Sequence, residues 1–353
     1  MPASDIAPPA HGASDCAHAP TNPVLVEVTR GTGVESRHRG AVVVADADGR
    51  VVQALGDPEQ LVFPRSAIKP LQALPLVDSG AAAALEITDA ELALACSSHS
   101  GTARHTGAVA RWLNRIACGE SDLACGGHIP ADTASAQGLL ETRTPPGRLH
   151  DMCSGKHAGF LALARHLGAP VAGYETLEHP AQQAVLAVLS EMTGLDRLLD
   201  HPHGVDGCSA PALSMPLGSL ATAMARLAAP EAQAPARRAA CHAIVRAVTT
   251  HPEMLAGPGQ ADTEIQARAG GRALIKSGAE GVYLAALPRA GLGVALKVDD
   301  GAPRASVPVL GAVLRRLQAL DEADAEALAG WLTPTLRDRR GRVVGGVAVR
   351  PAL

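Results

Sequence analysis

The feature that most constrains the fold is the placement of strand-like segments at both ends of the chain, around an alanine- and leucine-rich middle. Residues 24–52 alternate and carry β-branched runs separated by an Asp-Gly turn, a pattern that predicts an N-terminal hairpin. Helical spacing dominates from Ser66 to about Gly270. Strand signals return over 272–300, two helical segments follow, and 343–349 forms a last strand. We therefore predict an α+β fold, with one antiparallel sheet built from both termini and a helical lobe inserted within about 66–270.

The composition of the chain argues against nucleic-acid-binding, secreted and membrane-spanning classes of protein. With 353 residues the chain can bury a full core, and its net charge of −4 argues against a nucleic-acid surface. Seven cysteines, an odd number, are unlike a secreted disulfide framework. The first 22 residues lack a secretory pattern, and no run is long enough to span a bilayer. We expect a cytoplasmic protein without membrane or nucleic-acid partners, in which 1–22 is a flexible tail and 23–353 a single catalytic unit.

Lysine is rare in this chain. Only four of the 31 basic residues are lysine, namely Lys69, Lys156, Lys276 and Lys297. Arginine can replace a surface lysine at little cost, but it cannot replace a lysine that must lose its proton. The remaining lysines are therefore candidates for chemistry.

Two early segments present hydroxyl groups. In FPRSAIKPLQAL, Ser66 and Lys69 are three residues apart, so on a helix the amine could take the proton of the serine hydroxyl. Arg65 could lower the pKa of the lysine and hold a substrate carboxylate. In LACSSHSGT, Ser98 and His99 lie at a helix entry, where backbone donors cluster. The alternative in both places is a set of capping and turn serines.

The next two segments carry possible metal ligands. HDMCSGKHAGF places Cys153, Lys156 and His157 at a helix start, and HGVDGCSAP places Asp206 and Cys208 in a turn. Two thiols and a neutral lysine amine could complete a zinc shell with one open position. The alternative is that both cysteines are small buried hydrophobic residues, the commonest role of a free cysteine.

Lys276 in ALIKSGAEGVY ends a strand before a Ser-Gly turn, from which its amine could point into a cleft. Hydrolases of the penicillin-recognising type have a lysine at a comparable position, followed by a small hydroxyl residue and glycine. Together with the Ser66-x-x-Lys69 pair, this pattern resembles the serine β-lactamase architecture.

In chain order, the motifs FPRSAIKPLQAL, CSSHSG, CGGH, CSGKH, VDGC, HPEMLAG and LIKSGAEG resemble the asparaginase II family of rhizobial type. The resemblance implies a serine-β-lactamase-like, homodimeric enzyme that hydrolyses L-asparagine to L-aspartate and ammonia. It matches Ser66 with Lys69 and Ser98 with Lys276 as catalytic pairs, and it implies Arg65, His99, Asp206 and His157 as substrate-binding or metal-flanking residues. It also implies Cys153, Lys156 and Cys208 as zinc ligands.

Two alternatives stay open at this point. A glutaminase, another amidase or a β-lactam-type hydrolase would use the same serine chemistry, because one added methylene changes binding by only ~1–3 kcal/mol. A catalytically silent sensor of an amino acid or of zinc would use the cleft for binding alone. The presence of all four Ser/Lys residues favours an enzyme.

Overall fold

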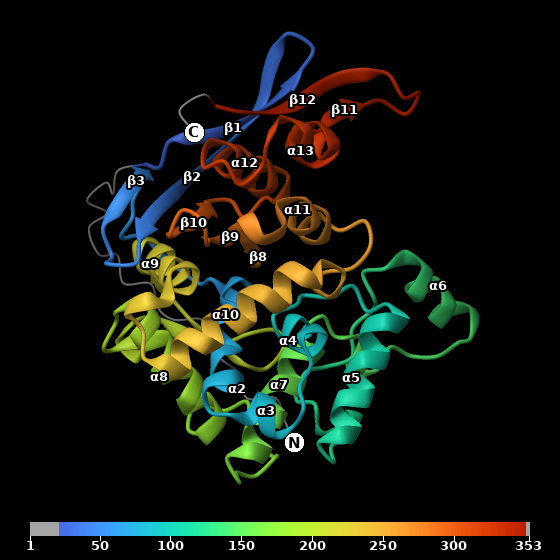
Figure 1. The fold of residues 1–353 in the computed structure, drawn as a ribbon. Helices are drawn as coiled ribbons and strands as arrows, with labels where there is room; N and C mark the ends of the chain where they lie inside the picture. Colours follow the sequence, from blue (N-terminus) through green and yellow to red (C-terminus); the bar gives the residue numbers. More distant parts are fainter. Residues whose placement is uncertain (1–20, 351–353) are drawn as a thin grey trace, which may run out of the picture.

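The computed structural model describes residues 21–350, and an antiparallel sheet of eight strands crosses its upper half (Figure 1). The strand order is β11-β12-β1-β2-β10-β9-β8, and β3 pairs with β2 beside this path. Strands from both ends of the chain are therefore neighbours, which confirms the predicted α+β class. The strands are β1 (Val24–Arg30), β2 (Gly33–Asp46), β3 (Val51–Leu55), β8 (Leu274–Ser277), β9 (Val282–Leu287), β10 (Leu292–Val298), β11 (Thr335–Arg337) and β12 (Val343–Val349).

The long strand β2 joins the two halves of this sheet. Its first half pairs with β1 up to Arg39, and its second half pairs with β10 from Gly40 onward. In the second half, alternate side chains point to opposite faces: Val43 lies in one buried core and Val44 in the other. Burial on both faces explains why this strand reads as the uninterrupted apolar run AVVVA.

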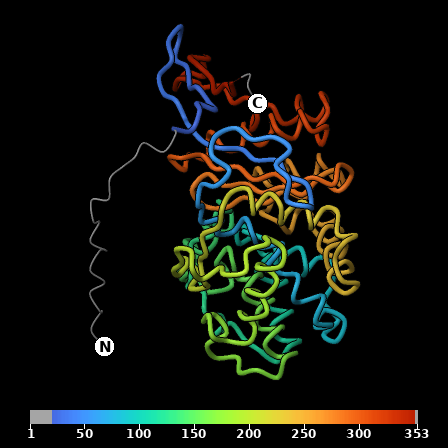
Figure 2. Tube along the Cα trace, turned by 90° about the vertical axis from the view of Figure 1, so that its left-hand side faces the viewer, coloured from blue at the N-terminus to red at the C-terminus, as the bar shows by residue number. Residues whose placement is uncertain are grey.

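Helices cover both faces of the sheet. α9 (Leu217–Ala228) packs on β2, β9 and β10 from the side of the helical lobe, and α12 (Pro303–Arg316) packs on the other face (Figures 1 and 2). The lobe fills the lower half of Figure 1 and carries the larger core. The remaining helices are α1 (Lys69–Gln72), α2 (Leu74–Asp78), α3 (Ala81–Ala84), α4 (Asp89–Ala95), α5 (Ala103–Arg115), α6 (Thr133–Glu141), α7 (Ser154–His166), α8 (Pro180–Thr193), α10 (Pro235–Thr250), α11 (Ala261–Ala269), α13 (Glu322–Ala327) and α14 (Ala329–Leu332).

Short elements complete the lobe, and some differ from the sequence-based prediction. Two small two-stranded sheets pair β4 (Leu61–Val62) with β7 (Met215–Pro216), and β5 (His203–Val205) with β6 (Pro211–Leu213). The predicted hairpin over 24–52 is a three-stranded meander, because β3 follows the Asp-Gly turn and continues to Leu55. The sequence does not predict β11, because three residues are too few to show the alternation of apolar and polar side chains that indicates a strand.

The N-terminal boundary lies close to a buried anchor. Most of the predicted tail, residues 1–20, lies outside the described residues. Asn22 is buried, and its amide donates to Gln60 and Asp299, each at 2.9 Å. The division into a tail and one catalytic unit stays a prediction. None of the helices within residues 21–350 combines the length and the hydropathy needed to cross a membrane.

Gly293 of β10 tests the packing of α9 on the sheet. A Cβ atom at this position would lie 2.0 Å from the backbone oxygen of Ala221 and 2.3 Å from the backbone nitrogen of Ala225, so Gly293→Ala must push the helix away. We expect a loss of about 1–3 kcal/mol in the free energy of unfolding, measured by urea denaturation. Gly204→Ala is the control, because nothing lies within 4 Å of its added Cβ. Equal stability of the two variants would contradict this packing.

Candidate active site

Ser66 lies in a 3-10 turn, η1 (Arg65–Ile68), which leads directly into α1. The predicted α-helix from Ser66 is therefore a tighter turn, because Pro70 sits in the first turn of α1 and supplies no backbone N–H. The turn packs against the end of β8 through Gly278, where an added Cβ would lie 2.3 Å from the carbonyl oxygen of Pro64. Glycine after the Lys-Ser pair thus lets the two segments approach closely.

Arg65 and Asp206 form an ion pair at the edge of this turn. The guanidinium donates through Nη2 at 2.6 Å and through Nε at 3.2 Å to the same carboxylate oxygen. Burial would raise the pKa of Asp206, but the bonds from Arg65 and the charge of Lys156 lower it overall. Arg65 has a backbone φ of 49°, a strained conformation for a residue with a side chain. The ion pair therefore holds both substrate-binding candidates together and helps to fix the turn.

Lys69 is fully buried, and its amine contacts the segment that carries Ser98. Nζ donates to the carbonyl oxygen of Ser97 and to Oγ of Ser98, the latter at 3.1 Å. The contact therefore joins Lys69 to Ser98, whereas the sequence pattern pairs Lys69 with Ser66. The hydroxyl of Ser66 forms no hydrogen bond with another residue of the described chain, and it is half-buried.

The backbone around Ser98 is held by the HPEMLAG motif. The N–H groups of Ser98 and Ser100 donate to the carbonyl oxygens of Leu255 and Ala256, at 2.9 and 2.7 Å. The N–H of His99 donates to Met152 at 3.1 Å from the opposite side. Ser98 is thus presented from an extended segment fixed on both sides, which accounts for a motif to which the sequence alone assigns no role.

His99 supports this segment from within the protein. Its Nδ1 accepts from the N–H of Gly101 at 3.2 Å, and its Nε2 lies 2.8 Å from Oγ of Ser154. Burial, followed by the charges near it, lowers the pKa of His99 well below its ordinary value, so the ring is neutral. Both ring nitrogens are occupied by internal partners, and its predicted contact with substrate stays a prediction.

Lys276 is the second fully buried lysine, and it is held by a carboxylate network. Its Nζ donates to the carbonyl oxygen of Ser277 at 2.8 Å and to Oγ of Ser277 at 3.1 Å, and lies 3.4 Å from Oδ2 of Asp262. Burial lowers the pKa of Lys276 to about 8, assisted by the charge of Lys69 and opposed by Asp262. Lys276 makes no hydrogen bond with Ser98, its predicted partner, within the described chain.

The three predicted metal ligands also come together. Nζ of Lys156 donates to Sγ of Cys208 at 3.1 Å, and the side chains of Cys153 and Cys208 influence each other's pKa. Interaction with the side chain of Cys208, helped by the charges of Lys69 and Lys156, holds the pKa of Cys153 well below its ordinary value despite burial. Within residues 21–350, no three His, Cys, Asp or Glu side chains gather as a metal site, so a metal here needs the lysine amine as its third ligand. Two sulfurs and a nitrogen form a donor set that suits zinc.

His157 lies beside these ligands in the first turn of α7. Its Nδ1 is 2.6 Å from the hydroxyl of Tyr174, which accepts from the N–H of Ala124. Burial lowers the pKa of His157 well below its ordinary value, and its Nε2 has no hydrogen-bond partner among residues 21–350. The ring is thus a neutral side chain that braces α7 beside the thiols.

Residues 26–349 match the family described as L-asparaginase II. The chain belongs to the L-asparaginase II family. A comparison with curated proteins returned no match. The rhizobial type within the family stays a prediction.

Solved structures similar to this family member share little sequence with it. A structure of Mglu is 17% identical, with 79% of this chain and 61% of that chain covered and a TM-score of 0.37. A beta-lactamase from Mycobacterium bovis is 13% identical, with 82% and 94% covered and a TM-score of 0.38. The D-alanine carboxypeptidase AmpC from Burkholderia cenocepacia is 14% identical, with 77% and 93% covered and a TM-score of 0.35. This chain thus spans about 61% of the length of Mglu, and the family match alone decides the assignment.

Sequence reasoning missed the residues that hold Lys276. Asp262 accepts from Ser277 and from Tyr283, whose hydroxyl lies 2.7 Å from Oδ1. One signal was available, because Tyr283 is one of only two tyrosines and lies in an apolar strand, where a buried hydroxyl needs a partner. The carboxylate itself is on α11, 14 residues before Lys276 and outside the lysine motif.

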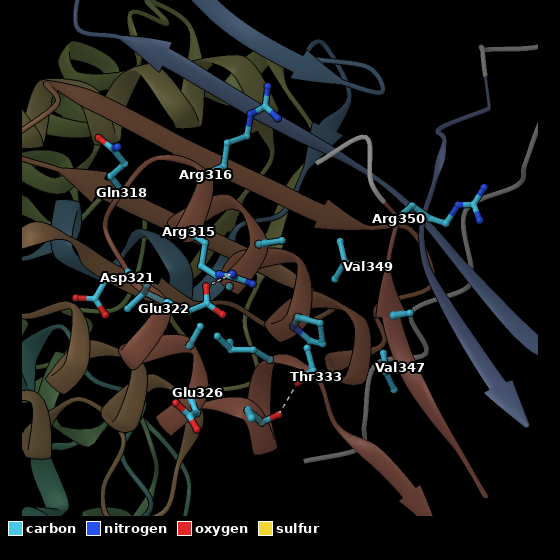
Figure 3. A pocket seen from close by; sticks show the side chains of 18 residues that line it. Arg315, Arg316, Gln318, Asp321, Glu322, Glu326, Thr333, Val347, Val349 and Arg350 are labelled. Carbon is cyan, nitrogen blue, oxygen red and sulfur yellow. Dashed lines mark hydrogen bonds and ion pairs between the residues drawn. The ribbon is translucent and has the colours of Figure 1, made fainter.

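A large groove elsewhere on this asparaginase II family member is separate from the site. It has a volume of about 1270 Å³ and lies between α12, α13, α14 and β12 (Figure 3). Arg315, Glu322 and Arg350 are among its lining residues, and none of the predicted site residues is. The chemistry of the Ser/Lys cluster therefore lies outside this groove.

The buried amine of Lys276 gives a testable pH dependence of stability. Its folded pKa of about 8 lies below the unfolded value of about 10.4, so the charged form is penalised in the folded state, and the penalty is relieved as pH rises through 8. Relative to Lys276→Met, the wild type should gain about 1 kcal/mol in the free energy of unfolding between pH 7 and pH 9. Urea denaturation at each pH measures the difference. Parallel curves for the two proteins would contradict a lowered pKa.

Proposed function

We propose that this protein is an amidohydrolase that converts L-asparagine to L-aspartate and ammonia. Membership of the L-asparaginase II family supports amide hydrolysis. The observation that carries the chemistry is the contact of 3.1 Å between Nζ of Lys69 and Oγ of Ser98, with a second buried amine at Lys276. A lysine amine within hydrogen-bond reach of a serine hydroxyl can act as the base that accepts its proton.

The reaction proceeds through an acyl-enzyme. The amine of Lys69 takes the proton of the Ser98 hydroxyl, either as Oγ of Ser98 attacks the side-chain amide carbon or as Ser98 relays a proton from Ser66, the alternative nucleophile. The tetrahedral intermediate collapses, the C–N bond breaks, and ammonia leaves with the proton held by the lysine. Water then cleaves the ester, with the lysine again accepting a proton, and aspartate is released.

Lys276 supplies the second basic group of the site. Burial, assisted by the charge of Lys69, lowers the pKa of Lys276 to about 8, so this amine becomes neutral between neutral and mildly alkaline pH. Activity should therefore rise from neutral to mildly alkaline pH. Arg65 remains the proposed partner of the substrate α-carboxylate, since a guanidinium binds a carboxylate through two parallel donors.

Cys153, Cys208 and Lys156 are the proposed zinc ligands. When bound, zinc would act as a Lewis acid that fixes the substrate and the site. The lowered pKa of Cys153 makes a thiolate available as a ligand. Asp206 and His157 flank this set, and the ion pair of Asp206 with Arg65 links it to the Ser66 turn.

Glutamine is the main competing substrate, because one methylene separates it from asparagine and is worth only ~1–3 kcal/mol. The rate of ammonia release from asparagine and from glutamine shows which amide is the better substrate. The same measurement with a chelator tests whether zinc is needed for turnover. Tight binding of asparagine without turnover would instead favour a sensor. The homodimer remains a prediction from the family resemblance.

Substitution of the Ser/Lys cluster tests the mechanism. Ser98→Ala, Ser66→Ala and Lys69→Met should each lower kcat/KM for ammonia release by at least ~100-fold if the residue takes part in acyl transfer. Lys297→Met is the control, because this lysine donates only to backbone oxygens of Glu280 and Val298. The nucleophile is the serine whose loss abolishes trapping of the acyl-enzyme. Normal turnover after loss of Lys69 and of both serines would refute the mechanism.

Zinc content tests the ligand set. Elemental analysis of protein purified without added zinc should find about one zinc per wild-type chain and much less in Cys208→Ser, because loss of a thiolate removes one of three ligands. Cys241→Ser is the matched control, since Cys241 is a buried thiol on α10 outside the set. The same zinc content in Cys208→Ser and wild type would contradict the assignment.

A further inference from the structure

We propose that Asp262 is the positioning residue for Lys276, holding the lysine amine in place in both of its protonation states. The proposal rests on the proposed amidohydrolase function, in which Lys276 gains and loses a proton. Asp262 is the second residue of α11 and is only 4% exposed. It comes from an element that carries none of the sequence motifs of the four catalytic candidates.

The carboxylate of Asp262 is fixed by donors other than the lysine. Oδ2 accepts from the backbone N–H of Ser277 at 3.1 Å and from its hydroxyl at 2.5 Å. Oδ1 accepts from the hydroxyl of Tyr283 at 2.7 Å. Tyr283 lies on β9, next to the β8 residues, and pairs with Ser277 in the sheet register. Three bonds from two neighbouring strands thus lock the carboxylate and Ser277 to each other.

Ser277 in turn holds the amine. Lys276 Nζ lies 2.8 and 3.1 Å from the carbonyl and hydroxyl oxygens of Ser277, and 3.4 Å from Asp262. An ammonium group has three N–H donors and a neutral amine has two. Loss of a proton therefore costs only the longest of the three contacts, and the two contacts with Ser277 remain. The amine nitrogen can therefore keep its position in both protonation states.

Asp262 also balances the charges that face Lys276. Lys69 on α1 repels its ammonium form, whereas Asp262 on α11 and the thiolate of Cys153 at the start of α7 favour it. Cys96 at the end of α4 and Tyr283 on β9 complete the surroundings, and burial raises the pKa of both, so they stay neutral. Asp262 is thus a fixed negative charge at hydrogen-bonding distance from Lys276, and its loss should lower the pKa of the lysine.

A direct titration of the lysines tests this role without relying on turnover. The chain has four lysines, so [13Cε]lysine labelling gives four side-chain NMR signals, and Lys276→Met assigns the one of interest. In Asp262→Asn the titration midpoint of Lys276 should fall by more than one pH unit. Asp299→Asn is the matched control, because Asp299 faces Lys297 and should move only that midpoint. An unchanged Lys276 midpoint in Asp262→Asn overturns the proposal.

A second variant keeps the test decisive if Asp262→Asn does not fold. Ser277→Ala removes the hydroxyl that bridges the carboxylate and the amine, so the midpoint of Lys276 should again fall, and an unchanged midpoint overturns the proposal. Asp262→Glu keeps the charge but displaces it, and should retain the midpoint within half a pH unit while kcat falls about tenfold. Full kcat in Asp262→Glu also overturns a positioning role.

The pH profile of ammonia release separates the two proposals. In Asp262→Asn the alkaline rise of kcat/KM should shift to lower pH by the same amount as the NMR midpoint. If the wild type releases no ammonia from either amide, the proposed function fails, while the lysine titration still decides the role of Asp262. If the wild type is active and its profile does not follow the midpoint of Lys276, the positioning role in catalysis is refuted.

Discussion

The burial of two lysine amines close to one another is the constraint on which the rest of the site depends. Each ammonium would lose its hydration in the interior, and the two would repel each other. Hydrogen bonds to oxygen atoms of the protein replace the lost hydration. Lys69 donates to Ser97 and Ser98, and Lys276 donates to Ser277 and lies beside Asp262. These contacts require the ends of α1, α4 and β8 to meet, and that meeting is possible only because Gly278 lets the Ser66 turn approach the strand.

Much of the architecture follows from the sequence because its signals are local. Each of these signals lies within a short stretch of sequence and indicates which side chains are buried there. They are the apolar run of β2, the strands around Lys276 and the helical spacing of the middle segment. Rare lysines pointed to the site for a similar reason, because a basic residue that must become neutral cannot be arginine. Three of the four are buried, and Lys297 donates only to backbone oxygens.

The hydrogen-bond partners of the site lysines could not be predicted from the sequence in this way. Spacing along the chain joins Ser66 to Lys69, but the 3-10 turn leaves the amine beside Ser98, a partner brought by tertiary packing. Asp262 and the HPEMLAG carbonyl groups act across the fold through contacts distant in sequence. Such contacts depend on how helices and strands dock, which a periodic pattern in one segment does not encode.

The central strand β2 pairs with β1 along its first half and with β10 and β3 along its second half, and β1 itself pairs with β12. During synthesis from the N-terminus, the first strands and the serine turn emerge long before their partners. Pairings between segments so far apart carry a large loop-closure entropy and form slowly. An emerging chain therefore exposes the unpaired edges of β1 and β2 until β10 and β12 have been made, and these edges could pair with other chains in the meantime.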